Sequence, residues 1–319
     1  MTAMSDKESM KASFLTNYDE FLKNTEMSSV PPFPARIMLE VTNNCNHRCV
    51  FCAHKHMVRE KQNIDPDLCV RLLRRAYALG ARECAFHGGS EPFMHPGLHK
   101  MVRSAKDAGY TYTYLTTNGA ACSKERLLRV LEAGLDSIKF SINAGTAENY
   151  TLVHGTDAFG KALDMLQLAA EYRARSNADL KVYVSVITCS LNQDTVGQLH
   201  ALTDGLVDSI EYLPAAWLGK RTDIPFEELK PLFPGKAACM EPFNRFTVTT
   251  EGLIRACCND ADNFLVMGDA RAEDLEAIWA GERFRRLRQW HLERTLPEHC
   301  LCHGCLLYAD TRALPFETL

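Results

Sequence analysis

The 319-residue chain carries 36 lysines and arginines against 40 aspartates and glutamates, which gives a net charge of −4 and a pI near 6.3. This balance argues against a sequence-independent nucleic-acid-binding protein, because such proteins are usually basic. No apolar run reaches the roughly 18 residues of a membrane span, and the start, MTAMSDKESM, lacks the apolar core of a signal peptide. We therefore expect a cytoplasmic protein whose 13 cysteines stay reduced and serve metal or redox chemistry.

Strand-like and helix-like segments alternate between residue 36 and about residue 214. Strands are predicted at residues 36–42, 83–87, 111–116, 137–142, 181–188 and 209–213, and helices at residues 66–79, 95–109, 124–133 and 159–175, with one more helix before the last strand. This alternation predicts parallel βαβ units. Six units are too few for a closed eight-stranded barrel. We therefore predict an α/β fold, a partial (β/α)6 barrel similar to a TIM barrel, with a small cysteine-rich C-terminal module.

Composition divides the chain into four parts. Residues 1–35, which are mostly polar and end in VPPFPA, are expected to form a leader that packs on the barrel. The barrel is expected over residues 36–214, and a proline-containing linker of mixed charge over residues 215–235. In residues 236–319, six cysteines surround a predicted hairpin, FTVTTEGLIRACC, and two predicted helices at about residues 273–294. We predict that this last part is a module organised by its cysteines.

Three cysteines follow the first predicted strand with the spacing Cys45-x3-Cys49-x2-Cys52. In parallel α/β barrels the loops after the strands carry the reactive groups. Thiolates are the natural ligands of iron–sulfur clusters, and a four-iron cluster held by three thiolates keeps one iron open for a substrate or cofactor. The alternative is a zinc site, for which nearby histidines offer a fourth ligand: His47, His54 and His56.

The residues around these cysteines resemble the signature of the radical S-adenosylmethionine (SAM) superfamily. In that family an aromatic residue precedes the third cysteine and lies against the adenine of SAM, and Phe51 stands at this position. The open iron binds the amino and carboxyl groups of SAM. The resemblance therefore implies a SAM-binding [4Fe–4S] cluster on Cys45, Cys49 and Cys52.

A loop after the second predicted strand, HGGSEP, resembles the Gly-Gly-Glu-Pro loop of the same family. Ser90 departs from that pattern and is closer to its Gly-x-Gly-Glu-Pro variants. Glycines let a backbone approach a ligand closely, and the Glu91 carboxylate could hold the ammonium group of SAM. The resemblance implies SAM contacts from the whole loop: Gly88, Gly89, Ser90, Glu91 and Pro92.

The third and fourth predicted strands end in TTNG and SIN, which resemble the Thr-Asn-Gly and Ser-x-Asp/Asn motifs of the family. Each motif alone is common in turns. Four such loops after successive strands would meet at one edge of a parallel sheet. The resemblance implies further SAM contacts from Thr117, Asn118, Ser141 and Asn143, with the polar side chains of the SIN motif reaching the ribose hydroxyls.

The resemblance also implies the chemistry. One electron from a reducing partner, such as flavodoxin or ferredoxin, enters the cluster and cleaves SAM into methionine and a 5′-deoxyadenosyl radical. That radical removes a hydrogen atom from an unactivated carbon of the substrate. The cofactor performs the difficult step, and the protein supplies orientation and exclusion of water.

The cysteines of the C-terminal part have the spacing Cys239-x12-Gly252-x4-Cys257, followed after a gap by Cys302-x2-Cys305. Four thiolates are a complete ligand set for an iron–sulfur cluster, and a structural zinc site is the alternative. The pattern resembles the twitch module, a shortened SPASM module. It is similar to the pattern in radical enzymes that act on 2-deoxy-scyllo-inosamine and aminoglycosides. A full SPASM module holds two auxiliary clusters and needs more cysteines, so we predict one auxiliary [4Fe–4S] cluster.

Two cysteines of this module, Cys258 and Cys300, lie outside that set. Each stands beside an assigned ligand and could replace it, or could be a spare thiol. A thiol close to a substrate radical can return a hydrogen atom to it. Cys258 is therefore a candidate hydrogen donor.

Relatives with twitch modules act largely on sugars and aminocyclitols, so the resemblance implies a radical SAM oxidoreductase or epimerase. We expect a small polar substrate, namely a sugar, an aminocyclitol or a nucleotide sugar, and no membrane or nucleic-acid partner. Radical modification of a ribosomally made peptide is an alternative, although 35 leader residues are few for a peptide-binding module. A non-catalytic iron–sulfur or zinc protein is the second alternative. The sequence predicts no oligomeric state.

Overall fold

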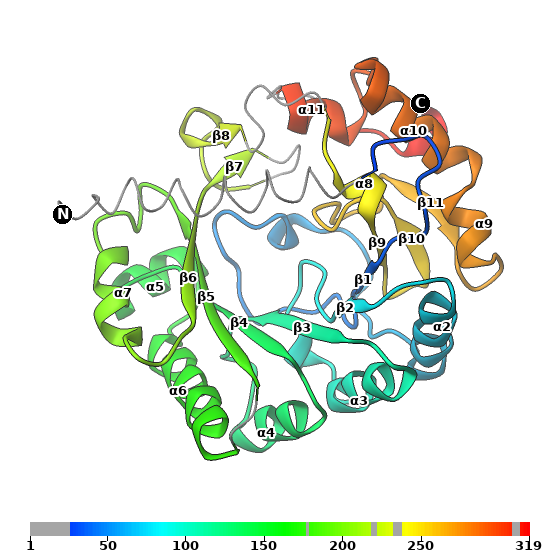
Figure 1. The fold of residues 1–319 in the computed structure, drawn as a ribbon. Helices are drawn as coiled ribbons and strands as arrows, with labels where there is room; N and C mark the ends of the chain where they lie inside the picture. Colours follow the sequence, from blue (N-terminus) through cyan, green and yellow to red (C-terminus); the bar gives the residue numbers. More distant parts are fainter. Residues whose placement is uncertain (1–25, 177–178, 218–221, 232–237, 308–312) are drawn as a thin grey trace, which may run out of the picture.

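The computed structural model describes residues 26–176, 179–217, 222–231, 238–307 and 313–319. Within these ranges, parallel strands paired in chain order form a curved sheet with helices on its outer side (Figure 1). The strands are β1 (Arg36–Leu39), β2 (Glu83–Ala85), β3 (Tyr112–Thr117), β4 (Ser137–Ser141), β5 (Lys181–Thr188) and β6 (Ser209–Pro214). The register places Ile138 of β4 beside Leu115 of β3 and Val182 of β5. The predicted α/β fold with an open parallel barrel is confirmed.

Helices connect these strands, and side-chain caps fix where several of them begin. They are α2 (Pro66–Ala78), α3 (Leu98–Ala108), α4 (Lys124–Glu132), α5 (Ala147–His154), α6 (Phe159–Ser176) and α7 (Val196–Thr203). The Asp65 carboxylate accepts a hydrogen bond from the Leu68 amide at 2.7 Å, and Pro66 is the first residue of α2. Ser123 and Thr146 cap α4 and α5 in the same way. The helices predicted between the strands are therefore present.

Helix α5, which follows β4 and ends at His154, was not predicted from the sequence. Its eight residues, AENYTLVH, carry no regular apolar stripe, so periodicity did not reveal it. Local signals were present, because Thr146 accepts a hydrogen bond from the Asn149 amide at 3.3 Å and Gly155 ends the helix with a φ of 66°. The end of this helix faces the cysteine loop described below.

The two faces of the barrel sheet have different chemistry. The outer face packs on the helices through fully buried apolar side chains: Leu115, Ile138, Phe140, Val182, Val184 and Val186. The alternate positions point to the other face and are half-buried: Tyr112, Tyr114, Lys139, Ser141, Tyr183, Ser185 and Glu211. The core therefore lies between sheet and helices, and the inside of the barrel is lined by polar groups.

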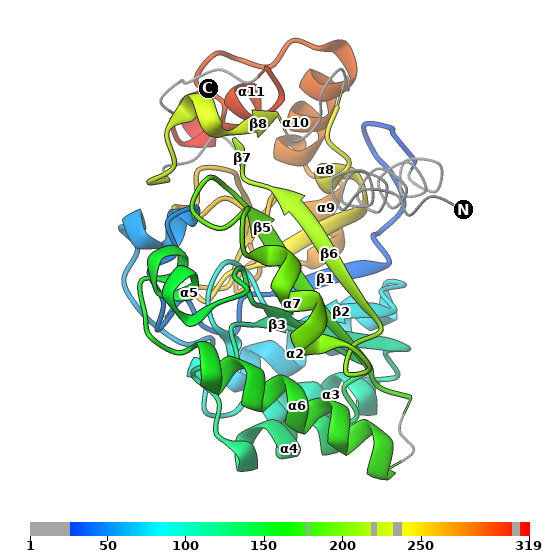
Figure 2. The same cartoon turned by 90° about the vertical axis from the view of Figure 1, so that its left-hand side faces the viewer.

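The C-terminal part extends the same sheet. Strand β9 (Arg245–Val248) pairs in parallel with β1, and β10 (Leu253–Arg255) and β11 (Val266–Asp269) follow in antiparallel order. The predicted hairpin is confirmed as β9 and β10, whereas β11 and the pairing of β9 with β1 were not predicted. Figure 2 shows the helices α10 and α11 at one end of the barrel. The helices of this part are α8 (Glu241–Asn244), α9 (Leu275–Trp279), α10 (Glu282–Glu293) and α11 (Leu301–Leu307).

Shorter elements complete the described part of the chain. Strands β7 (Ala216–Trp217) and β8 (Lys230–Pro231) pair within the segment predicted as a linker. Residues 218–221 and 232–235 of that segment, residues 236–237 of the predicted C-terminal module, and residues 1–25 of the predicted leader lie outside the described residues. The short 3-10 helices are η1 (Ala53–His56), η2 (Pro92–Met94), η3 (Phe226–Glu228) and η4 (Phe316–Thr318). Across the described ranges, every helix falls short of the length and apolar character that a membrane crossing requires.

Candidate active site

The loop between β1 and η1 carries the first three cysteines across the mouth of the barrel. It is hydrogen-bonded to the loop after β2, to the end of β3, to the end of α5 and to the segment after β6. These bonds are Glu91 N to Asn44 O at 3.0 Å, Asn118 Nδ2 to Asn46 Oδ1 at 2.9 Å, Arg48 N to His154 O at 3.0 Å, and Thr222 Oγ1 to Val50 O at 2.8 Å. The fold thus holds the loop from four sides.

Cys45 and Cys49 lie near enough to Cys52 that the charge of Cys52 contributes to the pKa of both. Burial is the main cause that raises the pKa of Cys45 to about 12, with smaller contributions from the charges of Glu91 and Cys52. Burial, followed by the charges of Cys52 and Cys45, also raises the pKa of Cys49. Thiols that oppose one another's ionisation become thiolates when metal cations lie among them. This donor set fits an iron–sulfur cluster.

Two of the histidines considered as zinc ligands have other partners. The Nε2 atom of His54 lies 2.9 Å from the carbonyl oxygen of Asn43. His56 Nε2 lies 2.9 Å from the Asp223 carboxylate, which also binds Lys55. The contacts with Asp223 tie η1 to the segment after β6, and the contact of His54 ties η1 to the loop after β1. In both histidines the Nε2 atom is engaged by the protein.

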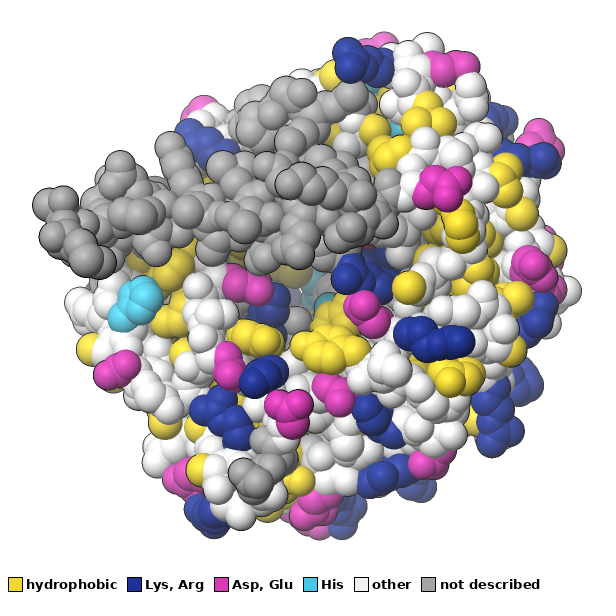
Figure 3. All heavy atoms as spheres, in the orientation of Figure 1, with side chains coloured by type: hydrophobic (Ala, Val, Ile, Leu, Met, Phe, Trp, Pro, Cys, Tyr) yellow, Lys and Arg dark blue, Asp and Glu magenta, His cyan; other side chains and the backbone are white. Residues whose placement is uncertain are grey.

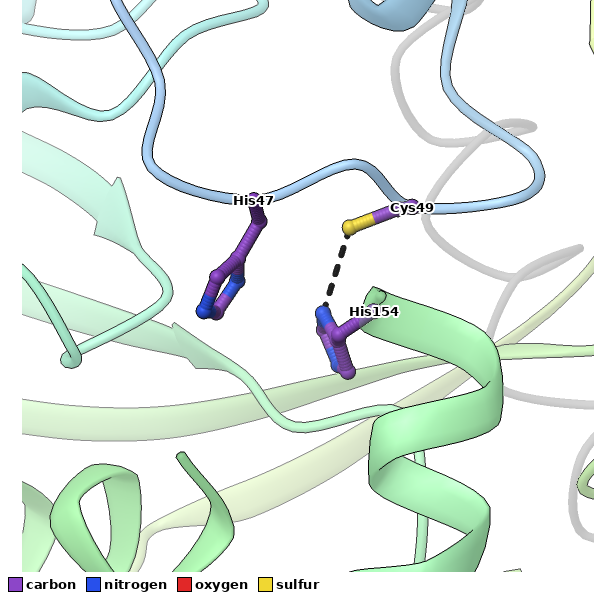
Figure 4. Close-up of side chains that lie close together, drawn as sticks. All are labelled: His47, Cys49 and His154. Atoms are coloured by element: carbon purple, nitrogen blue, oxygen red, sulfur yellow. Dashed lines mark hydrogen bonds between the residues drawn. The ribbon is translucent and has the colours of Figure 1, made fainter. Parts of the chain in front are cut away.

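A histidine that the sequence analysis did not single out, His154, contacts Cys49 (Figure 4). Its Nδ1 atom lies 3.2 Å from the Cys49 Sγ atom, and its Nε2 atom accepts a hydrogen bond from the Asn143 amide at 3.3 Å. Burial lowers the pKa of His154 to about 3, with a further contribution from His47, so the imidazole is neutral. His47, Cys49 and His154 place one ligand atom each within 4.8 Å of one another. Sequence spacing gave no signal of this contact, because 105 residues separate the two partners.

The loop after β2 packs closely against the residue that follows β1, Glu40. A Cβ atom on Gly88 would lie 2.8 Å from the Cβ atom of Glu40, so no side chain fits there. Gly89 has a φ of +93°, which favours glycine. The Ser90 hydroxyl donates to the Thr42 carbonyl and fastens the loop to the segment after β1. The glycine at position 88 thus has a packing reason that the motif alone did not indicate.

Glu91 joins the loop after β2 to the end of β3. Its buried carboxylate accepts hydrogen bonds from the Asn118 amide at 2.7 Å, the Thr117 hydroxyl at 2.8 Å and the Phe93 amide at 3.0 Å. Burial raises the pKa of Glu91 to about 7, although these bonds act in the opposite direction. A carboxylate has about four acceptor sites, so one further donor can bind. Pro92 follows directly and begins η2.

The end of β4 is also held by protein contacts. The Asn143 side-chain oxygen accepts a hydrogen bond from the Ile187 amide at 2.6 Å, and its carbonyl oxygen accepts one from Asn192 at 2.6 Å. The Ser141 hydroxyl oxygen lies 3.4 Å from that of Ser185 on β5. Asn143 is therefore buried and engaged, whereas Ser141 is half-buried on the inner face.

Phe51 lies at the edge of a small apolar cluster near the barrel mouth. It is half-buried, and its ring centroid is 6.5 Å from that of His154. The buried members of the cluster come from α5 and from the segments after β5 and β6: Val153, Cys189, Ala215, Ile224 and Leu229. The Phe51 side chain thus packs against apolar side chains.

The four C-terminal cysteines predicted as ligands line a single cavity of about 100 Å³: Cys239, Cys257, Cys302 and Cys305. Cys302 and Cys305 lie on α11, whereas the other two precede α8 and follow β10. Apolar side chains complete much of the wall, including Pro242, Leu265, Leu301 and Leu306. Four thiols gathered from three segments around one apolar space fit a four-thiolate iron–sulfur cluster.

The two remaining cysteines of the module stand beside members of this set. The Cys258 thiol is hydrogen-bonded to Cys257 and lies outside the cavity lining. Its carbonyl oxygen lies 3.8 Å from the position that a Cβ atom of Gly89 would take, so this segment touches the loop after β2. The Cys300 thiol contacts Cys302.

A buried ionic network joins the barrel to the C-terminal hairpin. The Arg59 guanidinium lies 2.6 Å from the carboxylates of both Glu40 and Glu251. Arg255 is fully buried and donates to Glu40 at 3.1 Å and to the Gly88 carbonyl at 3.0 Å. This network was not predictable from the sequence, because its members are spread over more than 200 residues.

Charged groups line the inside of the barrel. Lys139 of β4 pairs with Glu211 of β6 at 2.5 Å. His87 lies beside the Tyr114 ring, with 5.5 Å between centroids, and its buried Nδ1 atom has no hydrogen-bond partner among the described residues. Burial lowers the pKa of His87 to about 3, and the charges of Arg245 and Lys139 lower it further. Figure 3 shows acidic and basic side chains interspersed around a hollow on the face that opens to the viewer.

Comparison with known proteins agrees with this arrangement. Residues 39–200 match the family model of the radical SAM superfamily, and residues 239–306 match that of the SPASM iron–sulfur cluster-binding domain. A GTP 3′,8-cyclase of Chlorobaculum tepidum is 33% identical over 134 residues, which are 41% of this chain and 40% of the cyclase. A tungsten-containing aldehyde ferredoxin oxidoreductase cofactor-modifying protein of Pyrococcus furiosus is 31% identical over 139 residues, 43% of this chain and 38% of that protein. The match thus spans about two fifths of each curated relative.

Solved structures share the fold over most of the chain. BtrN in complex with AdoMet and 2-DOIA has a TM-score of 0.56 at 20% identity, covering 88% of this chain and 92% of BtrN. SuiB of Streptococcus suis bound to S-adenosylmethionine has a TM-score of 0.69 at 15% identity, covering 97% of this chain and 79% of SuiB. At these identities the likeness shows the fold alone.

The two family matches indicate which cofactors the protein binds. The radical SAM domain implies a [4Fe–4S] cluster and SAM, and the SPASM domain implies auxiliary iron–sulfur clusters. Both cysteine sets described above have donor chemistry that fits such clusters. The first match covers just over half of the chain and contains the cysteine loop and the strand ends around it. The chain therefore belongs to the radical SAM superfamily.

Proposed function

We propose that this radical SAM enzyme acts on a small polar substrate, a sugar, an aminocyclitol or a nucleotide sugar, and oxidises one alcohol group or inverts its carbon. The observation that supports this proposal is the polar inner face of the barrel. Lys139 and Glu211 form an ion pair there, and the hydroxyls of Ser141 and Ser185 lie close to each other. Donors and acceptors on rigid strands suit a ligand rich in hydroxyl and amino groups.

The cofactor sites follow from the residues already described. We propose that the SAM cluster is held by Cys45, Cys49 and Cys52, and a single auxiliary cluster by Cys239, Cys257, Cys302 and Cys305. We propose SAM contacts from Phe51, Gly88, Gly89, Ser90, Glu91, Pro92, Thr117, Asn118, Ser141 and Asn143. When bound, the clusters and SAM supply a carbon-centred radical and an acceptor for the electron that an oxidation releases. A flavodoxin or ferredoxin is the proposed reductant.

The protein's own groups orient SAM and exclude water around it. Glu91 fixes the loops after β2 and β3 through three hydrogen bonds, and its remaining acceptor site suits the ammonium group of SAM. Phe51 offers an apolar ring to the adenine, backed by the apolar cluster at the barrel mouth. Ser141, half-buried on the inner face, can reach a ribose hydroxyl. Asn143, the other proposed SAM contact of this motif, also holds the ends of β4 and β5 together by accepting a hydrogen bond from the Ile187 amide.

Oxidation and epimerisation place different demands on the C-terminal cysteines. Oxidation requires only that an electron leave the substrate radical. Epimerisation requires a hydrogen donor on the opposite face of the radical carbon. Cys258 is the proposed donor because its segment touches Gly89 of the loop after β2 and its thiol lies outside the cavity of the auxiliary set.

The test compares three forms of the protein, purified without oxygen: wild type, Cys49→Ala and Cys69→Ala. Cys69 is a buried cysteine of α2 that belongs to neither cysteine set, and it serves as the matched control. We expect wild type and Cys69→Ala to form 5′-deoxyadenosine from SAM with dithionite, and Cys49→Ala to form none. Equal product from Cys49→Ala and wild type would overturn the ligand assignment.

The substrate class is tested with deuterated polyols, aminocyclitols and nucleotide sugars. Deuterium transfer into 5′-deoxyadenosine with a ketone product indicates oxidation. Solvent hydrogen returned to the substrate carbon, and lost in Cys258→Ala, indicates epimerisation. No transfer from any of these compounds contradicts the proposed substrate class.

Peptide modification is the second candidate, because SuiB has also been solved bound to a precursor peptide, with a TM-score of 0.67 to this chain. Deuterium transfer from a ribosomally made peptide, and from none of the small molecules, would establish it in place of the first proposal. A non-catalytic iron–sulfur or zinc protein would form no 5′-deoxyadenosine under any of these conditions.

A further inference from the structure

We propose that His154 is a positioning residue that donates a hydrogen bond to the Cys49 ligand of the SAM cluster, and so raises the reduction potential of that cluster. The proposal rests on the assignment of Cys45, Cys49 and Cys52 as its ligands. Its geometric basis is the 3.2 Å contact between His154 Nδ1 and Cys49 Sγ (Figure 4). Neither the sequence motifs nor the comparisons assign a role to His154.

The direction of this hydrogen bond is fixed from the far side of the ring. The Asn143 backbone amide donates to His154 Nε2 at 3.3 Å. A nitrogen that accepts a hydrogen bond carries a lone pair, so the proton of the neutral imidazole must be on Nδ1. The Nδ1–H group therefore faces Cys49 as a donor. A thiolate that binds iron accepts such a bond.

The hydrogen bond from Asn143 to His154 Nε2 also disfavours direct metal binding by His154. His47, Cys49 and His154 are close enough together to suggest a single-ion site. Ligation through Nδ1 would move the imidazole proton to Nε2, where it would face the Asn143 N–H group. Two donors opposite each other leave both unsatisfied, which is costly in a buried site. Donation to a cluster ligand satisfies both ring nitrogens.

The position of His154 does not depend on its side chain alone. Its carbonyl oxygen accepts a hydrogen bond from the Arg48 amide at 3.0 Å, and the Val153 carbonyl accepts one from Val50 at 3.0 Å. The Tyr150 ring stacks on the imidazole with 4.0 Å between centroids. Substituting the side chain thus keeps the backbone contacts that hold the cysteine loop.

A donor to a ligating sulfur withdraws negative charge and favours the reduced cluster. The hydrogen bonds that lead to Cys49 through His154 begin at Asn143, a proposed SAM contact just after β4. The cluster and the SAM-binding strand end would therefore share one hydrogen-bonded path. Loss of a hydrogen bond to a charged acceptor changes an equilibrium constant by about tenfold or more. A tenfold change in the equilibrium constant of a one-electron reduction corresponds to a shift of about 59 mV in the reduction potential.

The experiment is an EPR-monitored redox titration of the full protein with both cluster types present. In His154→Leu, the cluster whose EPR signal responds to SAM is expected to have a lower reduction potential. The equilibrium constant for its reduction should fall about tenfold. His154→Asn, whose amide nitrogen can stand near the position of Nδ1, is expected to recover part of this change. The auxiliary signal is the internal control and should not move. Tyr150→Phe keeps the stacked ring and should leave both potentials unchanged.

Isotope labelling separates hydrogen bonding from ligation. With 15N-histidine, pulsed EPR of the reduced SAM cluster should show a weak nitrogen coupling that disappears in His154→Leu. An unchanged potential in His154→Leu would overturn the proposal while leaving the Cys49 assignment intact. A strong coupling, typical of a nitrogen bound to iron, would overturn it in favour of ligation. Absence of any SAM-responsive signal in wild type would overturn the ligand assignment, and this proposal with it.

Discussion

Replacing Arg255 by methionine should loosen the junction between the barrel and the C-terminal hairpin. Arg255 is fully buried, and its guanidinium binds Glu40 at 3.1 Å, the Gly88 carbonyl at 3.0 Å and the Asp260 carbonyl at 2.6 Å. Removing one partner of a buried ion pair costs about 3 to 5 kcal/mol because a buried charge loses its counterion. Glu40 keeps Arg59 as a second partner, so we expect the lower end, about 3 kcal/mol. With a urea dependence of about 3 kcal/mol per molar, the midpoint should fall by about 1 M.

The matched control is Arg75→Met, which removes another arginine that links the barrel to the C-terminal part. Arg75 of α2 binds Asp274 at 2.6 Å, but the two side chains are 43% and 45% exposed. An exposed pair contributes less than about 1 kcal/mol. Anaerobic urea unfolding, followed by circular dichroism and by iron–sulfur absorbance, measures both variants. Equal midpoints for the two variants would refute the reasoning, because burial would then not be what distinguishes the pairs.

Three further predictions concern the site. Burial raises the pKa of Glu91 to about 7 from its ordinary 4.5. Between pH 4.5 and 7 the folded protein therefore keeps a proton on Glu91 that the unfolded chain releases. The free energy of unfolding should fall as the pH rises through this range, by up to about 3 kcal/mol. Glu91→Gln should flatten that slope in urea midpoints taken from pH 5 to 8, and a persisting slope contradicts the assignment. Cys302→Ala should lower the iron content by the share of the auxiliary cluster and leave the SAM-responsive EPR signal in place; loss of both signals contradicts separate sites. Thr146→Ala removes the cap of α5 and should lower the free energy of unfolding by about 1 kcal/mol, and no change in the urea midpoint would show that the cap is not needed.

The sequence predicted the features that depend on neighbouring residues. The alternation of strand-like and helix-like segments predicted the six barrel strands, and the spacing of the cysteines indicated both candidate metal sites. It did not reveal α5, whose short, weakly patterned sequence depends on its caps and on packing. It also could not show which donors meet the Glu91 carboxylate, because those lie on another strand end. His154 was missed for both reasons: it lies on the unpredicted helix and meets a cysteine far away in the sequence.

Pairing between β1 and β9 explains why the second cysteine set belongs to the barrel rather than to a tethered domain. Four residue pairs, from Arg36 with Arg245 to Leu39 with Val248, continue the sheet across the boundary. Without β9, the backbone N–H and C=O groups on one side of β1 would be unpaired, and such an edge can pair with another chain. Glu40, directly after β1, then binds both Arg59, which follows η1, and Arg255 of the hairpin. Backbone pairing and a shared carboxylate therefore connect the segments that carry the two cysteine sets.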